Sequence, residues 1–356
     1  MRIRFNPVAA TALAAACALQ STLALAWDYE GHRVVNEVAL ASLPADFPAF
    51  VKEPLNAERI AWLCTEPDRW RSSPDLPTRH LNAVDHYINL EQLPRAGLTP
   101  ETISSFRYEF ALQFAAARVS HREQFPEIEA GKDPDHTRGW IGFLPWTITE
   151  YFGKLRGDFA RLKVLEDENL GTAAEIAQTK ASICELMGIM GHYVGDGSQP
   201  LHTTDHHNGW VGDNPHGYTT SKGFHSWIDS GFINRAGITY AGVGSRIKPV
   251  EPFALPAPVN ERDPMFAHVM NYLVAQHAFV EPLYQLDKQG ALRSAVASSS
   301  IEGREFIVLR LLSGGEMLGR IWVTAWRTAA PDSFLRGQLL RKQAAAAAVH
   351  SAESGK

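Results

Sequence analysis

The sequence predicts an all-α protein with a single multi-helix domain, and three observations support this prediction. Apolar residues recur at helical spacing along most of the chain, for example at Ile183, Met187 and Val194. No run of alternating polar and apolar residues bounded by hairpin turns appears. The composition is that of a globular protein, with 45% hydrophobic and 21% charged residues over 356 positions.

The charge balance limits the classes of ligand that the chain can bind through bulk electrostatics. It contains 34 Lys and Arg against 39 Asp and Glu, a formal net charge of −5. A protein that binds nucleic acid through a basic surface is therefore excluded. Any phosphate chemistry here needs a separate source of positive charge.

The first element is a secretory signal peptide over residues 1–26. Two arginines without an acid precede a twelve-residue apolar run at 8–19, which is too short to cross a bilayer. Ala24-Leu25-Ala26 forms a small-x-small cleavage site, so we expect Trp27 to become the first residue of a mature chain with a net charge of −7. The sequence thus predicts an exported protein, periplasmic or extracellular, without a transmembrane anchor. A lipoprotein signal at Cys17 is a minor alternative.

Helices are expected in four further places. One follows His32 and ends at Pro44, and a second contains the apolar stripe from Ile183 to Val194. Two further helical regions cover 265–281 and 301–329. The intervening breaks, rich in Pro, Gly and Asn, lie at 74–78, 132–139, 205–222 and 248–260.

These elements predict one helical domain over residues 27–342, with an insertion at roughly 95–175 and a flexible tail at 343–356. Two cysteines remain after cleavage, Cys64 and Cys184. Export permits a disulfide between them, and a buried reduced pair is the equal alternative.

Histidine and aspartate recur at metal-ligand spacing in the second half of the chain. His192 and Asp196 are separated by four residues, as are His225 and Asp229, so each pair projects from one face of a helix. His202 follows a helix-ending proline and returns toward the first pair. Imidazole and carboxylate together suit zinc or another borderline divalent metal.

Further motifs accompany this constellation in a fixed order. They are Trp27-x4-His32, His86-Tyr87-Ile88-Asn89 and His192-Tyr193-x2-Asp196-x2-Gln199-Pro200-Leu201-His202. In this order they resemble the trinuclear-zinc single-strand-specific nuclease family (nuclease S-one/P-one type), with bacterial zinc phospholipase C as a more distant relative. The resemblance implies a phospholipase C/nuclease-like fold with helices around a buried trinuclear zinc cleft.

The resemblance also implies three Zn²⁺ ions and nine ligands. Trp27 would bind through its free α-amino nitrogen and its carbonyl oxygen, and Asp196 would bridge two ions. The nine expected ligands are Trp27, His32, Asp68, His86, His192, Asp196, His202, His225 and Asp229. Asp68, His86 and His192 would hold one ion, and His202, His225 and Asp229 the third.

By the same resemblance, we expect hydrolysis of single-stranded DNA and RNA to 5′-phosphorylated products, with 3′-nucleotidase activity as a further expectation. A zinc-bridging hydroxide would be the nucleophile. Asp68 and Asp196 would act through the metals, and Arg71 would stabilise charge on the phosphate. Tyr87 and Asn89 would bind a nucleobase. The expected partner is single-stranded nucleic acid or a nucleotide, with no stable protein partner.

Two segments depart from the nuclease pattern. The loop at 205–216 lacks the Gly-Gly-Asn turn of the fungal and plant enzymes, and Gly223-Phe224-His225-Ser226 is more similar to the phospholipases. A zinc phospholipase C and a non-catalytic zinc-binding envelope protein therefore remain as alternatives. The insertion also contains three large aromatic residues, Trp140, Phe143 and Trp146. Three interpretations are open for them: they line a substrate groove, they contact lipid, or they belong to the core.

Overall fold

The computed structural model describes residues 27–258, 260–294 and 300–354, and the predicted signal peptide lies outside these ranges. The described residues form helices and loops and contain no strand, which confirms the all-α prediction. The α-helices are α2 (Tyr29–Ser42), α3 (Pro54–Leu63), α4 (Glu66–Arg71), α5 (Leu76–Ala83), α6 (Gln92–Arg95), α7 (Arg107–Ser120), α8 (Leu144–Leu162), α9 (Ala173–Ser198), α10 (Phe224–Ser226), α11 (Ile233–Ala236), α12 (Tyr240–Val243), α13 (Pro264–His277), α14 (Val280–Lys288), α15 (Ile301–Thr328) and α16 (Ser333–Ser354). Shorter 3-10 or π turns are η2 (Ala49–Lys52), η3 (Val84–His86), η4 (Arg122–Gln124), η5 (Ala130–Lys132), η6 (Lys163–Asp167), η7 (Pro200–Thr203), η8 (Trp227–Phe232) and η9 (Gly244–Arg246).

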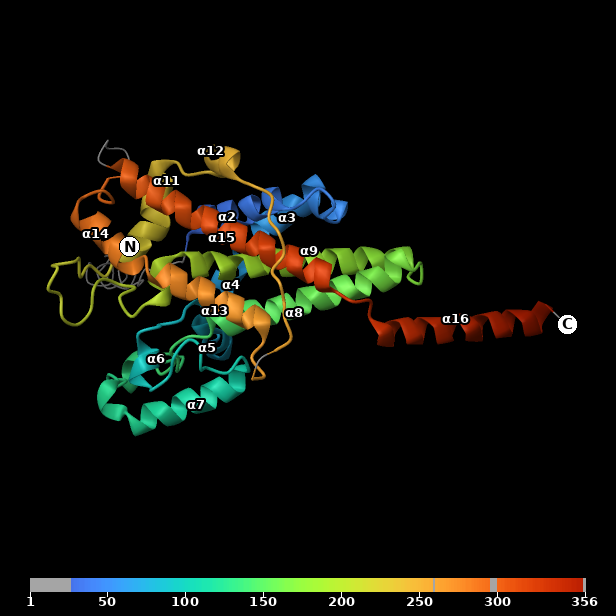
Figure 1. Cartoon of the computed structure of the whole chain (residues 1–356), viewed down its shortest axis with the longest axis horizontal. Helices are drawn as coiled ribbons and strands as arrows, with labels where there is room; N and C mark the ends of the chain where they lie inside the picture. The colour runs from blue at the N-terminus through green and yellow to red at the C-terminus, as the bar shows by residue number, and fades with distance from the viewer. Residues whose placement is uncertain (1–26, 259, 295–299, 355–356) are drawn as a thin grey trace, which may run out of the picture.

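The long helices lie side by side around one hydrophobic core (Figure 1). Helix α15 packs against α2, α8 and α9, while α3 also contacts α9 and α13 contacts α8. Trp27, Trp146 and Trp322 are fully buried in this core. A single continuous core of this size is that of one domain.

Local sequence signals explain where the two site-bearing helices begin and end. The Asp28 side chain accepts a hydrogen bond from the Tyr29 backbone N–H and caps α2. Helix α9 begins with a capping box formed by Thr172 and Glu175, and it ends two residues before Pro200. The predicted apolar stripe on α9 is buried, with Ile183, Met187 and Val194 in the core.

A buried asparagine holds α2 against α3 and α9. Asn36 Nδ2 donates to the Ile60 carbonyl oxygen at 2.8 Å and to the Gly188 carbonyl oxygen at 3.1 Å. A Cβ at Gly191 would lie 1.7 Å from Asn36 Oδ1, so only glycine allows this close approach of α9. The contact fixes the height of α2 along α9 and therefore sets His32 opposite His192.

Two boundaries differ from those that the sequence predicts. The region at 265–281 is interrupted after His277, and α14 restarts at Val280. Pro282 in the first turn of α14 has no N–H to donate to the Ala278 carbonyl, and its ring clashes with that carbonyl in a continuous helix, so the break falls there. The structure also continues α16 through Ser354, where a flexible tail is expected, because the alanine run there has a high helix propensity. Beyond its first turns α16 extends away from the body of the molecule (Figure 1).

The insertion contributes to the core. Trp146 and Phe143 are buried, and Trp146 stacks on Phe110 of α7 at 4.2 Å between ring centroids, while the partly buried Trp140 packs against the same cluster. Of the interpretations left open for these aromatics, core packing is the one that the structure supports. Cys64 and Cys184 are both buried and free of a disulfide.

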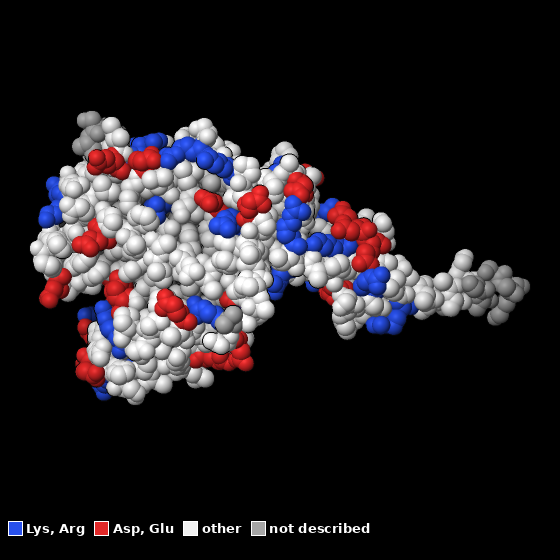
Figure 2. All heavy atoms as spheres, in the orientation of Figure 1, with Lys and Arg blue, Asp and Glu red and all other residues white. Residues whose placement is uncertain are grey.

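The surface agrees with the charge balance of the sequence. Acidic and basic side chains are interspersed over the face shown in Figure 2, without a broad basic area. Within the described ranges, no helix combines the length and the apolar composition that crossing a bilayer requires.

Candidate metal centre

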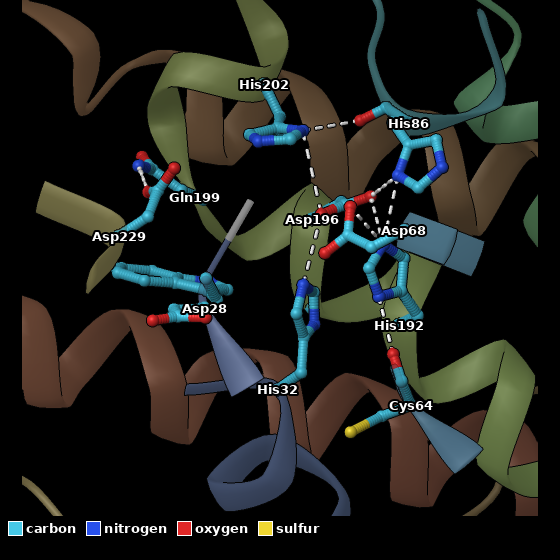
Figure 3. Close-up of polar contacts among 12 residues, drawn as sticks. Asp28, His32, Cys64, Asp68, His86, His192, Asp196, Gln199, His202 and Asp229 are labelled. Carbon is cyan, nitrogen blue, oxygen red and sulfur yellow. Dashed lines mark hydrogen bonds and ion pairs between the residues drawn. The ribbon is translucent and has the colours of Figure 1, made fainter. Parts of the chain in front are cut away.

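Eight of the nine predicted ligands are side chains that converge from seven elements, and Figure 3 labels all of them except His225. Helix α9 supplies two of them from adjacent turns, and each other element supplies one. The contributions are His32 from α2, Asp68 from α4, His86 from η3, His192 and Asp196 from α9, His202 from η7, His225 from α10 and Asp229 from η8.

Two groups of potential ligands share His192. One contains His32, His192 and Asp196, the other Asp68, His86 and His192, and within each group the ligand atoms lie within 4.8 Å of one another. We refer to these five residues as the Asp196 cluster.

The carboxylate of Asp196 lies between the two groups. Its Oδ1 is 3.4 Å from His32 Nε2, and its Oδ2 is 2.9 Å from His86 Nδ1 and 3.3 Å from His192 Nε2. The two oxygens thus face different imidazoles, which is the arrangement that a carboxylate bridging two cations requires.

The third group consists of His202, His225 and Asp229, and we refer to it as the Asp229 cluster. His225 Nε2 lies 2.9 Å from Asp229 Oδ2, across the junction of α10 and the π turn η8. His202 Nδ1 is 3.7 Å from Asp196 Oδ1, so the two clusters are neighbours.

Groups outside the clusters orient the ligands. His192 Nδ1 donates to the Cys64 carbonyl oxygen at 2.6 Å, and His202 Nδ1 donates to the His86 carbonyl oxygen at 2.5 Å. These bonds direct the Nε2 atom of each ring away from its backbone partner. Gln199 Nε2 donates to Asp229 Oδ1, and its Oε1 accepts from the Leu201 N–H at 2.9 Å.

In the sequence, Gln199 is only one position of a motif, and no partner for its side chain follows from the motif. Its amide joins the end of α9 to Asp229, which is thirty residues away, so only the tertiary structure could reveal this role. The same holds for the Cys64 carbonyl, because a backbone acceptor leaves no signal in residue type.

The unpaired atoms of the clusters test whether a metal fits. Buried polar atoms are normally hydrogen-bonded, and leaving one unpaired is costly. Within the described part of the chain, buried atoms that make no hydrogen bond occur in most of the candidate ligands: His32 Nδ1 and Nε2, Asp68 Oδ1, His86 Nε2, Asp196 Oδ1, His202 Nε2, His225 Nδ1 and Nε2, and Asp229 Oδ2. Some of these atoms, among them Asp68 Oδ1, His225 Nε2 and Asp229 Oδ2, have only an ion-pair contact. Imidazole nitrogens and carboxylate oxygens are the donors that zinc prefers, so these residues fit divalent ions.

Burial keeps most of the imidazoles in the form that binds metal. Burial lowers the pKa of His32 and His202 to about 4 and that of His86 and His225 to about 3. These four rings are therefore neutral at neutral pH and have a lone pair available. Burial also acts on His192, but Asp196 and Asp68 overcome it and raise its pKa.

The carboxylates of the two clusters respond differently to burial. For Asp196, burial is opposed and outweighed by His192 and His202, which hold its pKa well below the usual range. For Asp229, burial prevails over His202 and Gln199 and raises its pKa well above the usual range. Asp196 is thus ionised without any metal, whereas Asp229 needs an added positive charge to ionise.

Trp27 lies beside both clusters. Its fully buried indole donates from Nε1 to Ser198 Oγ at 2.8 Å, and the N–H of the next residue, Asp28, donates to the Asp229 carbonyl oxygen at 3.2 Å. The backbone of Trp27 is therefore held close to Asp229. Coordination by its α-amino group stays a prediction.

Arg71 lies one helical turn after Asp68, and its Nε is 2.6 Å from Asp68 Oδ1. Burial opposes ionisation of Asp68, but Arg71 and His192 overcome it and lower the pKa of the carboxyl. Both side chains are mostly buried at the edge of the Asp196 cluster. Contact of Arg71 with a bound phosphate stays a prediction.

Tyr87 and Asn89 flank His86, as the sequence requires. Tyr87 is partly buried, desolvation raises the pKa of its phenol, and its ring and carbonyl pack against Gly142 of the insertion. Asn89 is buried, and its backbone N–H donates to the Ile141 carbonyl oxygen at 2.8 Å. Their binding of a nucleobase stays a prediction.

An open cavity of about 320 Å³ adjoins the Asp196 cluster. His32 and Asp68 form part of its wall, together with residues at the start of α2 and along α4. The cluster is thus reachable from solvent.

Comparison with known proteins adds no identification. No protein-family model matches the chain, and no curated protein matches it significantly.

Proposed function

We propose that this chain is a zinc-dependent phosphodiesterase of the single-strand nuclease type, which hydrolyses single-stranded DNA and RNA to 5′-phosphorylated products. The observation that carries the proposal is the position of Asp196, whose two oxygens face different members of two overlapping ligand groups while a third group lies beside them. The order of the sequence motifs supports the same conclusion.

Three Zn²⁺ ions would be held by the nine candidate ligands named above. When bound, such ions supply Lewis acidity and lower the pKa of coordinated water toward neutrality. The three carboxylates, Asp68, Asp196 and Asp229, would neutralise only half of the charge of three divalent ions. The site would then carry the positive charge that the rest of the acidic chain lacks.

The chain's own residues position the substrate. Arg71 presents a guanidinium at the edge of the Asp196 cluster, where it can bind a phosphate oxygen and stabilise the negative charge that develops during hydrolysis. Asp68 orients this guanidinium through their 2.6 Å contact. Binding of phosphate would exchange part of that ion pair for a contact with the substrate.

A zinc phospholipase C is the second candidate, and one observation favours it. Helix α7 exposes Tyr108, Leu112 and Val119, which lie along one stripe of the helix that faces solvent. An apolar stripe of this kind is unusual on a protein surface and would suit contact with lipid. A purely structural metal role is disfavoured by the cavity that opens onto His32 and Asp68.

The test uses the chain beginning at Trp27, loaded with zinc. We expect about three equivalents of zinc by elemental analysis, hydrolysis of single-stranded DNA, and little action on duplex DNA or on phosphatidylcholine vesicles. Loss of hydrolysis after chelation and its return with zinc would support the proposal. Cleavage of phosphatidylcholine alone would favour the second candidate, and metal binding without hydrolysis of either substrate would overturn both.

A matched control carries one glycine before Trp27. If the α-amino group is a ligand, this variant binds less zinc and is inactive, although its side chains are unchanged. Full activity of the extended chain would contradict the role of Trp27.

A further inference from the structure

The cavity beside the Asp196 cluster has a wall that the proposed metal chemistry does not use. Apart from His32 and Asp68, it is lined by Asp28, Tyr29, Thr65, Arg69 and Ser72. Two of these side chains project an aromatic ring and a guanidinium at its rim. These are the two chemical groups that contact a base and a phosphate in single-stranded nucleic acids.

Tyr29 presents its ring from a firmly held position. It is the first residue of α2, and its side chain is 40% exposed. The backbone N–H of Tyr29 donates to Asp28 Oδ1 at 2.8 Å, and the N–H of Asp28 donates to the Asp229 carbonyl oxygen at 3.2 Å. Tyr29 is therefore held through its neighbour Asp28, whose backbone is hydrogen-bonded to that of Asp229 in the Asp229 cluster.

The hydroxyl end of Tyr29 is held as well. Arg33, one turn further along α2, donates from Nη1 to the Tyr29 hydroxyl at 3.5 Å. Arg33 is itself bonded to both carboxylate oxygens of Glu58, at 2.9 and 2.6 Å. A ring positioned at both ends loses little conformational entropy when a flat ligand stacks on it.

Arg69 can bind a ligand without giving up its ion pair. Its side chain is 71% exposed and pairs with Glu66, one turn earlier on α4, at 2.8 Å, while the Glu66 side chain is mostly buried. Both contacts to Glu66 come from Arg69 Nη1, so the Nε and Nη2 groups of the guanidinium can donate to a phosphate while the pair with Glu66 stays in place. Arg69 lies next to Asp68 in the chain, so a phosphate bound there would adjoin the Asp196 cluster.

We propose that this cavity binds one nucleotide of a single-stranded nucleic acid, with its base stacked on Tyr29 and a backbone phosphate bound by Arg69. The inference rests on the proposed function and adds a subsite to it. Stacking on Tyr29 requires a base with a free face, which a paired duplex does not offer. The subsite therefore gives a physical reason for preference of single strands, with little dependence on base identity.

Binding is measured by fluorescence anisotropy with a labelled phosphorothioate thymidine hexamer on the zinc-loaded chain beginning at Trp27. Stacking on one aromatic ring predicts that Tyr29→Ala weakens binding by about tenfold to a hundredfold. Tyr29→Phe keeps the ring and should bind within about twofold of the parent chain. Tyr240→Ala is the matched control, because Tyr240 is 37% exposed and lies outside this cavity.

The salt dependence separates the contribution of Arg69. Loss of one phosphate contact should lower the slope of log K against log salt by about 0.7 for a single strand, and we expect this change in Arg69→Gln. Tyr29→Ala should leave the slope unchanged.

Several outcomes overturn the inference. They are parent-like binding by Tyr29→Ala, equal weakening by Tyr240→Ala, and binding of phosphatidylcholine vesicles through Tyr29 in place of the hexamer. Hydrolysis of bis(p-nitrophenyl) phosphate, which has no nucleobase, is measured in parallel. If the parent chain does not hydrolyse bis(p-nitrophenyl) phosphate, the result counts against the proposed function alone. If the parent chain hydrolyses it but Tyr29→Ala binds the hexamer as the parent does, the result counts against the subsite alone.

Discussion

The two neighbouring clusters stabilise their central carboxylates in different ways. Asp196 is fully buried, but four imidazoles lie within 3.7 Å of it, and they favour its charged form. Asp229 is equally buried and has one imidazole nitrogen at 2.9 Å and the neutral amide of Gln199. Burial therefore dominates the pKa of Asp229 and not that of Asp196.

This difference indicates how the centre depends on its ions. The Asp196 cluster is close to electrostatic balance in the metal-free protein, so its geometry is largely preformed. In the Asp229 cluster, the Asp229 carboxyl group ionises only when a cation is present to offset the cost of burying its charge. We expect the Asp196 cluster to bind metal more tightly, and the predictions below test this order.

The largest effect is expected for Asp196→Asn compared with Asp229→Asn. An amide cannot offer two anionic oxygens, so Asp196→Asn should lose about two zinc equivalents and Asp229→Asn about one. Hydrolysis should fall by at least about a hundredfold in Asp196→Asn. Elemental analysis and initial rates measure both. Equal loss of zinc in the two variants would remove the distinction between the clusters.

Acid should destabilise the metal-free protein. Four imidazoles with lowered pKa values are neutral in the fold, whereas in the unfolded chain they protonate near pH 6.5. The unfolded state thus binds more protons below that pH, and stability is lost as the pH falls from 6.5 toward 4. The raised pKa values of His192 and Asp229 act with the opposite sign and offset part of this loss.

Since four rings act in one direction and two groups in the other, we expect a lower free energy of unfolding at about pH 5.5 than at about pH 7.5. Urea unfolding of the chelated protein at the two pH values measures it. His202→Asn should flatten the dependence, since one titrating ring is removed. A stability that rises on acidification would contradict the assigned pKa directions.

A smaller and more local effect is expected for Gln199→Leu. Asp229 would lose the amide that orients its Oδ1, so the dissociation constant of one ion should increase by about 10-fold to 100-fold. Affinity for the ions of the Asp196 cluster should stay unchanged. Competition titration with a zinc chelator resolves the sites, and uniform weakening of all of them would point to a general loss of folding instead.

The smallest effect is expected from a pair of glycine substitutions. A Cβ at Gly195 would lie 2.6 Å from His32 Nδ1, so Gly195→Ala should displace this ring and weaken metal binding by about tenfold. Gly153→Ala on α8 meets no atom within 4 Å and should stabilise the fold by about 0.5 to 1 kcal/mol. Thermal unfolding and zinc titration compare the two. Unchanged zinc affinity in Gly195→Ala would place His32 outside the coordination sphere.

The sequence predicts the helical class together with α2, α9, α13 and α15, because apolar periodicity is a local signal. It gives no range for α3, α7 or α8. Helix α9 is an example of a predicted helix, since its apolar stripe and the Pro200 that follows its end are close together in the chain. Apolar spacing alone does not reveal the break after His277, because Pro282 lies beyond it and acts four residues back, on the Ala278 carbonyl. The sequence predicts a flexible tail where α16 ends, because the alanine run there is followed by polar residues and has no apolar stripe.

Residue type and spacing predict which side chains belong to the candidate site. They predict only part of the grouping of these side chains into two clusters. Spacing placed His192 with Asp196 and His225 with Asp229, as the structure shows. The contacts of Gln199 and of the Cys64 carbonyl join segments far apart in the chain, so they depend on helix packing alone. Tyr29 was not singled out, because an aromatic residue after a capping aspartate is unremarkable until its neighbours are known.

The candidate ligands are spread from His32 to Asp229, and α15, which packs against the helices that carry them, comes later still. During synthesis from the amino terminus, the emerging polypeptide therefore cannot assemble a complete cage until more than half of it has been made. Long-range closure of this kind is slow compared with local helix formation. A polypeptide that ends before Asp229 would consequently lack part of the candidate ligand set.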